Sequence, residues 1–505
     1  RRIERTFDDP ILRTVGLDAF VNGREKIFAP DRNNFAPRLG LAYSFGKDDG
    51  NILRLGAGFY YDQAPGVVVS QSRTVVPTFF TFNTAGVYQF LENGMAVGLG
   101  ILLPSTLRIR LGCREDTDFI GIRQPGTLNT IDPRTSVGCI LQKYLIEKRG
   151  GDEVRPVLHT VLPVHDLQMP MAYHYTAAFE REFGRHTVVS VAYVGTQGRH
   201  LLRQTTPNLG DHAPLGIFDL HITGGRPRFG GITAQPSQFD AGGTAHDRLS
   251  PQAGAVRIYE SSGNSRYNAL QLQVGSRLFN GPAFQFNYTL SKATDDVSDV
   301  FELAGAPALP QNSLTRAGEW AVANFDARHI FSGYATYPLP RLDGHPQKWR
   351  TFLLGSWDVT AKARFQSGQP FTVNTVRDNN TDGNLTDRPN TTEGIVATGD
   401  PRQPLLLTVD PQTLLAPERL DGAVGRNTFR AGSRFELDVS LAKNFVFKQR
   451  EMYDRKLTFR LDIFNLTNRA NFGVPVRYLE APGFGRAVST VTPARRLQLS
   501  LRWSF

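Results

Sequence analysis

One loop of the sequence has the spacing of a cation site. In residues 378–387 (DNNTDGNLTD), carboxylate and amide side chains alternate, and a glycine follows at position 383. Oxygen ligands at alternate positions, followed by a glycine for a sharp turn, are typical of the first half of a calcium loop. The predicted calcium ligands are Asp378, Asn380, Asp382 and Asp387. The closing bidentate Glu of an EF-hand is absent, because Pro389 stands at its place, and a solvated Asn- and Asp-rich turn is the alternative interpretation.

The chain has two cysteines, Cys113 and Cys139, and both lie in one long connection. In an oxidising compartment, a disulfide between them would stabilise the protein by about 3.5 kcal/mol on the chain-entropy model. Two unpaired thiols are the alternative.

No set of catalytic residues accompanies these two candidates. The ten histidines are scattered without metalloprotease spacing, and no Ser, His and Asp set indicates a hydrolase. The formal net charge of +10 comes from Lys and Arg spread through the chain, without a nucleic-acid-binding motif. We therefore expect neither an enzyme nor a protein that binds nucleic acid.

The elements that position the polar residues are strands in which apolar and polar residues alternate. In residues 356–366, Trp357, Val359 and Phe365 share one face, and charged or polar residues occupy the other. Eleven such runs are predicted as strands, at residues 37–45, 52–62, 172–182, 187–195, 267–279, 283–292, 325–338, 356–366, 434–447, 456–466 and 495–505. A small additional hairpin is expected near residues 86–103.

Short turns and long connections alternate strictly between these runs. This sidedness is typical of outer-membrane β-barrels, in which the short turns are periplasmic and the long loops are extracellular. We therefore predict an all-β, antiparallel transmembrane barrel, with a soluble β-sandwich as the alternative. Eleven is an odd number, so residues 1–34 are expected to form an extracellular loop that enters the barrel midway, and residues 35–505 its carboxyl-terminal half.

Charged residues on the polar faces of these strands are expected to face the barrel lumen. There they would pair across strands, contact a plug or, as the weaker alternative, contact a ligand. The predicted lumen-facing residues are Asp326, Arg328, Asp358, Lys362, Arg364, Arg460 and Asp462.

Two kinds of motif resemble a known family. The last strand, which ends in Phe, is similar to the assembly signal that the barrel-assembly machinery reads, formed here by Leu497, Leu499, Leu501, Trp503 and Phe505. Other segments resemble TonB-dependent outer-membrane transporters, most closely the Oar-like branch that bears a carboxypeptidase-regulatory domain. They are DRNNFAPRLGLAYSF (31–45), VAYVGTQGRHLL (191–202), NSRYNALQLQV (264–274), NFDARHIFSG (324–333), SGQPFTV (367–373) and DIFNLTNRANFG (462–473).

The resemblance implies a barrel of about 22 strands around an amino-terminal plug, embedded in outer-membrane lipid. It also implies energised uptake or export of a scarce extracellular ligand, driven by TonB and an inner-membrane motor that act on the plug. This sequence lacks the plug and the first half of the wall, so it is interpreted as a fragment of such a receptor. A passive porin-like channel and a surface adhesion protein that acts through its long loops are the alternatives.

Overall fold

The computed structural model describes most of the chain with defined gaps. The described residues are 24, 26–46, 50–66, 68–69, 88–90, 96–98, 160–184, 186–207, 220–223, 226–229, 256–278, 281–300, 309–339, 355–377, 379–380, 386–417, 420–447 and 455–504. Among them, no helix is long and apolar enough to cross a membrane.

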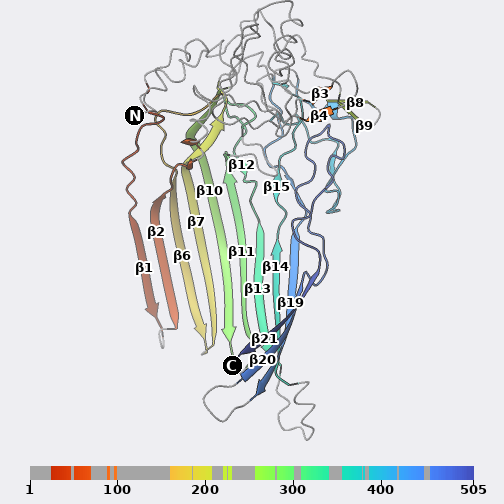
Figure 1. The fold of residues 1–505 in the computed structure, drawn as a ribbon. Coiled ribbons are helices and arrows are strands. Elements are labelled where there is room, and N and C mark those ends of the chain that lie inside the picture. The colour runs from red at the N-terminus through yellow and green to blue at the C-terminus, as the bar shows by residue number, and fades with distance from the viewer. Residues whose placement is uncertain are drawn as a thin grey trace, which may run out of the picture.

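Eleven strands form one antiparallel sheet in which the order along the sheet follows the order along the chain. They are β1 (Arg38–Phe45), β2 (Asn51–Tyr61), β6 (Met171–Phe183), β7 (Thr187–Thr205), β10 (Val256–Arg277), β11 (Ala283–Asp295), β13 (His329–Pro338), β14 (Trp357–Gln366), β19 (Arg434–Phe447), β20 (Arg455–Phe464) and β21 (Arg496–Ser504). The prediction of eleven main strands is confirmed. Figure 1 shows them as a curved wall, with the long connections at one end, here called the loop end, and the short turns at the other.

Shorter elements lie in the connections. Ala321–Val322 (β12) pairs with β11, and Thr160–Pro163 (β5) runs parallel to β10. The separate hairpins are β3 (Tyr88–Phe90) with β4 (Ala96–Gly98), β8 (Leu220–Thr223) with β9 (Arg226–Phe229), and β16 (Ile395–Ala397) with β17 (Leu405–Leu407). β15 (Pro370–Phe371) and β18 (Phe429–Arg430), which are far apart in the chain, form a further two-stranded sheet. A 3-10 helix, η4, spans Pro411–Leu414. The β3–β4 hairpin confirms the hairpin expected near residues 86–103.

The register of the wall gives it one apolar and one polar face. Residues directly opposite each other on paired strands share a face, so a row of partners shows what that face presents. One row crosses nine strands through Tyr43, Leu53, Phe179, Val191, Leu272, Tyr288, Phe331, Phe365 and Phe435. The next row, on the other face, runs through Glu180, Ser190, Gln273, Asn287, Ser332, Arg364 and Glu436. The alternation seen in single strands therefore continues across neighbouring strands from β6 to β19 on both faces, and Ile52 of β2, opposite Glu180, interrupts the polar row.

Three strand ends differ from the prediction by four residues or more. β7 continues ten residues beyond Gly195 to Thr205, and β10 begins at Val256 rather than at residue 267. These extensions pair with each other through two register shifts between Glu260 and Ser265, which break the regular alternation that the prediction required. β13 begins at His329 rather than at residue 325, because residues 323–328 bend to meet β11.

The carboxyl-terminal strand, β21, is the last strand of the sheet, and it carries the residues predicted to form the assembly signal. The side chains of Leu497, Leu499 and Leu501 are 68%, 67% and 69% exposed, and Trp503 is 48% exposed. They share the face of Leu461, which pairs with Leu499. Phe505 lies outside the described residues.

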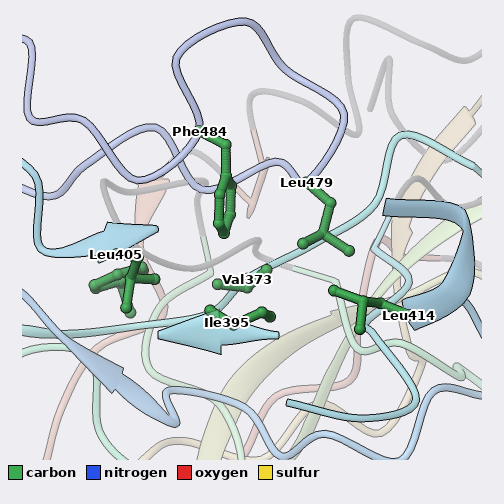
Figure 2. Packing of buried hydrophobic residues seen from close by; sticks show 7 residues of the cluster. Val373, Ile395, Leu405, Leu414, Leu479 and Phe484 are labelled. Atoms are coloured by element: carbon green, nitrogen blue, oxygen red, sulfur yellow. The ribbon is translucent and has the colours of Figure 1, made fainter. Parts of the chain in front are cut away.

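Two long connections, residues 367–433 and 465–495, pack together at the loop end into a unit that we call the loop body. Its apolar core, shown in Figure 2, consists of Phe371, Val373, Ile395, Leu405, Leu414, Leu479 and Phe484. Gly485 allows the connection 465–495 to approach Leu405 closely. Its φ of +74° favours glycine, and a Cβ there would lie 2.0 Å from the Leu405 carbonyl oxygen. Full burial of each large apolar side chain is worth about 1.5–3 kcal/mol, so this core stabilises the packing of the two connections against each other.

Candidate functional site

Four charged side chains are buried together at the loop end. Asp295, Glu319, Arg388 and Arg426 are 1%, 4%, 4% and 6% exposed. Asp295 ends strand β11, Glu319 precedes β12, and the two arginines belong to the loop body. The cluster has two carboxylates and two guanidinium groups, so its formal charges balance. We call it the loop-end cluster.

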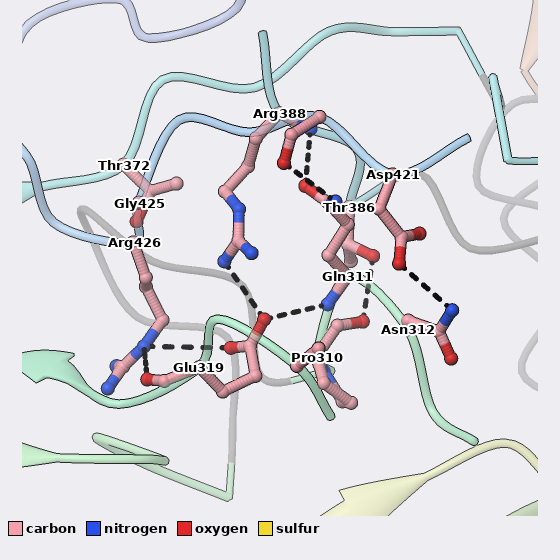
Figure 3. Close-up of polar contacts among 12 residues, drawn as sticks. Pro310, Gln311, Asn312, Glu319, Thr372, Thr386, Arg388, Asp421, Gly425 and Arg426 are labelled. Atoms are coloured by element: carbon pink, nitrogen blue, oxygen red, sulfur yellow. Dashed lines mark hydrogen bonds and ion pairs between the residues drawn. The ribbon is translucent and has the colours of Figure 1, made fainter. Parts of the chain in front are cut away.

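Glu319 is the centre of the loop-end cluster, as Figure 3 shows. Its Oε1 accepts a hydrogen bond from Arg388 Nη1 at 2.9 Å and another from the Gln311 backbone N–H at 3.2 Å. Its Oε2 lies 3.6 Å from Arg426 Nε. One carboxylate therefore holds two arginines that are 38 positions apart in the chain.

Arg426 joins the loop body to the wall. Its Nη2 donates to the backbone carbonyl of Asp295 at 2.6 Å and forms an ion pair with the Asp295 carboxylate. Its Nη1 donates to Ser298 Oγ at 2.8 Å. Removal of one partner from a buried ion pair costs about 3–5 kcal/mol, because it leaves an uncompensated buried charge. The cluster therefore fixes the position of the loop body over β11.

Uncharged side chains strengthen the same junction. Gln311 accepts from the Arg388 backbone N–H at 3.0 Å and donates to the Gly422 carbonyl at 3.1 Å. Asn312 Nδ2 donates to the Asp421 carboxylate at 3.0 Å, and Thr386 Oγ1 donates to the Pro310 carbonyl at 2.9 Å. Residues 309–320 are thus connected to the loop body at several points (Figure 3).

The predicted calcium loop borders this junction. Asp378 and Asp382 lie outside the described residues. Asn380 Nδ2 donates to the Gln311 carbonyl and to Asp421 Oδ1, both at 2.9 Å. Asp387 is 1% exposed, and its Oδ2 accepts from the backbone N–H groups of residues 379 and 380. Asn380 and Asp387 therefore act as structural ties here, and calcium binding stays a prediction. In the described part of the chain, no group of three His, Cys, Asp or Glu residues could hold a metal ion.

Most of the predicted lumen-facing residues lie on the polar face of the wall. Lys362 is opposite Asp438 and Arg364 is opposite Glu436, so opposite charges meet across β14 and β19. Asp358 accepts a hydrogen bond from Asn444 at 2.7 Å, and Arg460 pairs with Asp462 at 2.8 Å.

Asp326 and Arg328 lie before β13, not within it. Asp326 is 2% exposed, accepts from the Ala293 N–H and pairs with Arg430, both at 2.7 Å. It is therefore a tie between β11 and the loop body. Arg328 is exposed, and its carbonyl accepts from the Ser291 N–H at 3.0 Å. Cys113 and Cys139 lie outside the described residues.

One segment that carries the family resemblance, residues 462–473, supplies two buried asparagines that connect other segments at the loop end. Asn465 and Asn471, both from residues 462–473, are almost fully buried. Asn471 exchanges two hydrogen bonds with the backbone of Phe435, each at 2.9 Å, and Asn465 donates to the Pro493 carbonyl at 3.0 Å. Asn465 has a φ of +50°, a conformation that Asn tolerates better than most residues. These asparagines thus fix the path from β20 to β21 at the loop end.

A cavity of about 380 Å³ lies beside the loop-end cluster. Its lining residues come from β7, β10 and residues 296–320, and they are Arg203, Ser262, Asn264, Asp296, Arg316, Gly318, Glu319 and Trp320. Because a transmembrane strand needs only about 9–11 residues, the end of the 19-residue β7 that carries Arg203 extends past a membrane span. Burial lowers the pKa of the Arg203 guanidinium, and the negative charge of Asp296 opposes that shift.

The sequence did not reveal the loop-end cluster or the cavity. The ion pair between Glu319 and Arg388 joins residues 69 positions apart, and the contact between Arg426 and Asp295 spans 131 positions. No local spacing indicates such pairs. The sequence contained one indication of a site at this end of the wall. Three of the segments that resemble TonB-dependent transporters, 324–333, 367–373 and 462–473, all lie there.

Comparison with known proteins gives a family match over almost the whole chain. The model of a family described as an outer membrane beta barrel domain matches residues 6–498. No curated protein matches the chain.

Similar solved structures include three from the outer membrane receptors and transporters of bacteria. The outer membrane transporter YddB from Escherichia coli has 8% identity and a TM-score of 0.37, and the match covers 90% of this chain and 38% of that one. A mutant of the ferric enterobactin receptor PfeA from Pseudomonas aeruginosa has 9% identity, a TM-score of 0.40, and coverage of 92% and 39%. The siderophore receptor PirA from Acinetobacter baumannii has 11% identity, a TM-score of 0.37, and coverage of 93% and 41%. The chain thus spans about two fifths of the length of these structures.

Proposed function

Because the chain belongs to the outer membrane β-barrel domain family, and so to the bacterial outer membrane, we propose that it forms wall and loops of an Oar-like, TonB-dependent receptor. The observation that carries this proposal is the meeting of the resembling segments at the loop end. Segments 324–333, 367–373 and 462–473 lie where a strand joins a long connection at that end. Segment 31–45 enters β1 from the same end, and segments 191–202 and 264–274 pair with each other within β7 and β10. A receptor would use this end to meet its extracellular ligand.

The two faces of the wall support the proposed arrangement. The continuous row of apolar residues from Tyr43 to Phe435 would face lipid, and the polar row from Glu180 to Glu436 would face the lumen. Residues 1–34 would form an extracellular loop, and residues 35–505 the carboxyl-terminal half of the barrel. A plug would occupy the lumen, and TonB would act on that plug to move the ligand.

The loop body favours a gated receptor over a passive channel. Its apolar core and the ion pairs of Glu319 and Arg426 hold two long connections in one arrangement. An ordered surface at the loop end is what selective binding of a scarce ligand requires, whereas a passive pore needs only an open path.

Planar-bilayer recording of the natural full-length protein tests this proposal. A plugged receptor is expected to show no steady ion conductance and to co-purify with TonB from membranes. Steady conductance without any association with TonB would overturn the proposal and favour a porin-like channel.

A further inference from the structure

The two faces of the wall differ in the signs of the charges that they carry. Among the described residues of the eleven wall strands, up to the register shifts in β10, every acidic residue stands on the polar face. These residues are Glu180, Glu182, Asp295, Asp358, Glu436, Asp438 and Asp462. In the same part of the chain, the apolar face carries no acidic residue, but it does carry Arg and Lys. Its few charges are therefore all positive.

The basic residues of the apolar face lie toward the two ends of the wall. Toward the loop end they are Arg199, Arg266 and Lys292, and toward the end with the short turns they are Arg181, Lys443 and Arg455. Between these two groups, the described residues of this face are uncharged. Basic side chains at the two borders of an apolar band are placed at the depth where lipids carry their phosphate groups.

Arg266 and Lys292 are neighbours on this face, on the adjacent strands β10 and β11 (Figure 1). Lys292 is directly opposite Asn268, and Arg266 is two positions from Asn268, so the two cations are diagonal neighbours. Diagonal neighbours are separated by about 7–8 Å, a distance that lets two long side chains reach one group between them. Both side chains are exposed, and no described residue forms an ion pair with either. The pair therefore has no counter-charge within the described part of the chain.

The lengths of the two strands place this pair at a membrane surface. A transmembrane strand needs about 9–11 residues, so a span that begins at the first residue of β11, Ala283, ends near Lys292. On β10, a span of the same length counted back from Arg277 ends near Arg266. Both strands thus reach the surface at this pair of cations.

The groups around the pair suit a molecule that is polar at one end and apolar at the other. The Tyr193 hydroxyl donates to Asn268 Oδ1 at 2.8 Å, which directs the Asn268 amide so that its Nδ2 is the remaining donor. Toward the middle of the wall, Leu270 and Leu290 are directly opposite each other, and Leu270 is 47% exposed. Hydrogen-bond donors therefore border an exposed apolar surface.

We propose that Arg266 and Lys292 bind the phosphate group of an anionic lipid in the outer leaflet. The acyl chains of that lipid lie against Leu270 and Leu290. Phosphate oxygens accept from both the guanidinium and the ammonium group, and Asn268 supplies a further donor. A soluble anion would match the cations but would leave the leucines exposed to water, whereas a lipid covers both.

This inference goes beyond the proposed receptor function. It rests on the apolar face being the one that meets lipid, and it requires neither a plug nor TonB. The site faces away from the lumen, so a molecule bound there is part of the surroundings of the wall.

Native mass spectrometry of the natural full-length protein, released from a non-ionic detergent, tests the proposal. The probes are dioleoylphosphatidic acid, dioleoylglycerol, which has the same acyl chains without the phosphate, and sodium phosphate, which has no chains. Phosphatidic acid is expected to be retained more strongly than either of the others. Retention of dioleoylglycerol or of phosphate that equals or exceeds that of phosphatidic acid would overturn the proposal.

Variants show whether the lipid binds at this pair. Arg266→Gln combined with Lys292→Gln removes both charges, and about a tenfold loss in the retention of phosphatidic acid is expected. The matched control is Arg277→Gln combined with Lys456→Gln. It also removes one Arg and one Lys from wall strands, but both residues are exposed on the polar face. The control is expected to retain the lipid as the natural protein does.

Equal retention by the natural protein and by the variant of Arg266 and Lys292, or an equal loss in both double variants, would rule out this site. A loss in the control alone would mean that the polar face meets lipid, and it would also contradict the direction of the wall. The result is separable from the proposed transport. A protein that conducts steadily in a bilayer and still loses phosphatidic acid through Arg266→Gln and Lys292→Gln would contradict the receptor proposal alone.

Discussion

The wall and the loop body are stabilised in different ways. In the wall, each strand pairs with the next wall strand along the chain, for example β1 with β2 through eight pairs of opposite residues. In the loop body, single side chains such as Arg426 contact partners up to 131 positions away. The wall therefore depends on a pattern that many residues share, whereas the loop body depends on a few particular partners. The comparison predicts that single substitutions will affect the loop body far more than the wall.

The largest expected effect follows from the loss of charge on Glu319. Glu319→Gln leaves Arg388 and Arg426 buried without their shared carboxylate, and we expect a loss of about 3–5 kcal/mol in the stability of the loop body. Hydrogen exchange measured by mass spectrometry should show faster exchange in residues 370–373 and 395–397, with the wall strands unchanged.

Glu393→Gln is the control for this substitution, because Glu393 is exposed. If Glu319→Gln and Glu393→Gln exchanged alike, the central role of Glu319 would be wrong. If Glu319→Gln also accelerated exchange throughout β1 and β2, the two regions would not be independent.

The next largest effect is expected in the apolar core of the loop body. Leu405 is 2% exposed, and its neighbour Leu406 is 44% exposed. Leu405→Ala should destabilise the loop body by about 2–5 kcal/mol, because it removes buried methyl groups and leaves a cavity. Leu406→Ala should change stability by no more than about 0.5 kcal/mol. Urea-induced exposure of the loop body to protease measures both, and equal losses would contradict the packing in Figure 2.

The smallest effect is expected on the polar face of the wall. Arg54 on β2 pairs with Glu180 on β6 at 3.2 Å, and the Arg54 side chain is 51% exposed. Exposed ion pairs contribute less than about 1 kcal/mol, so Arg54→Ala should hardly shift the urea midpoint of the wall. A loss as large as that of Glu319→Gln would mean that the wall, too, depends on single partners.

The same contrast explains how much of the fold the sequence predicted. Alternation placed all eleven wall strands, because a one-residue slip would turn every apolar side chain to the other face. It failed at the loop ends of β7 and β10, where register shifts near Gly263 interrupt the period of two. It also placed Asp326 in a strand, although that residue turns inward to meet Arg430.

The candidate site was much less predictable. Glu319, Arg388 and Arg426 stand in segments without periodicity, and their partners are set by how the long connections fold over β11. The spacing of Asn380 and Asp387 predicts calcium ligands. In the structure, both residues make hydrogen bonds within the loop-end junction. Asp378 and Asp382 lie outside the described residues, so calcium binding by this loop stays a prediction.

We propose that the wall has one face toward lipid and one toward water. Spin labels attached one at a time to Val359 and Thr360, adjacent on β14, test it most directly in lipid vesicles. We predict that the label at 359 is relaxed mainly by oxygen, which dissolves in lipid, and the label at 360 mainly by a water-soluble nickel complex. The reverse pattern, or equal access of the nickel complex to both labels, would contradict the account.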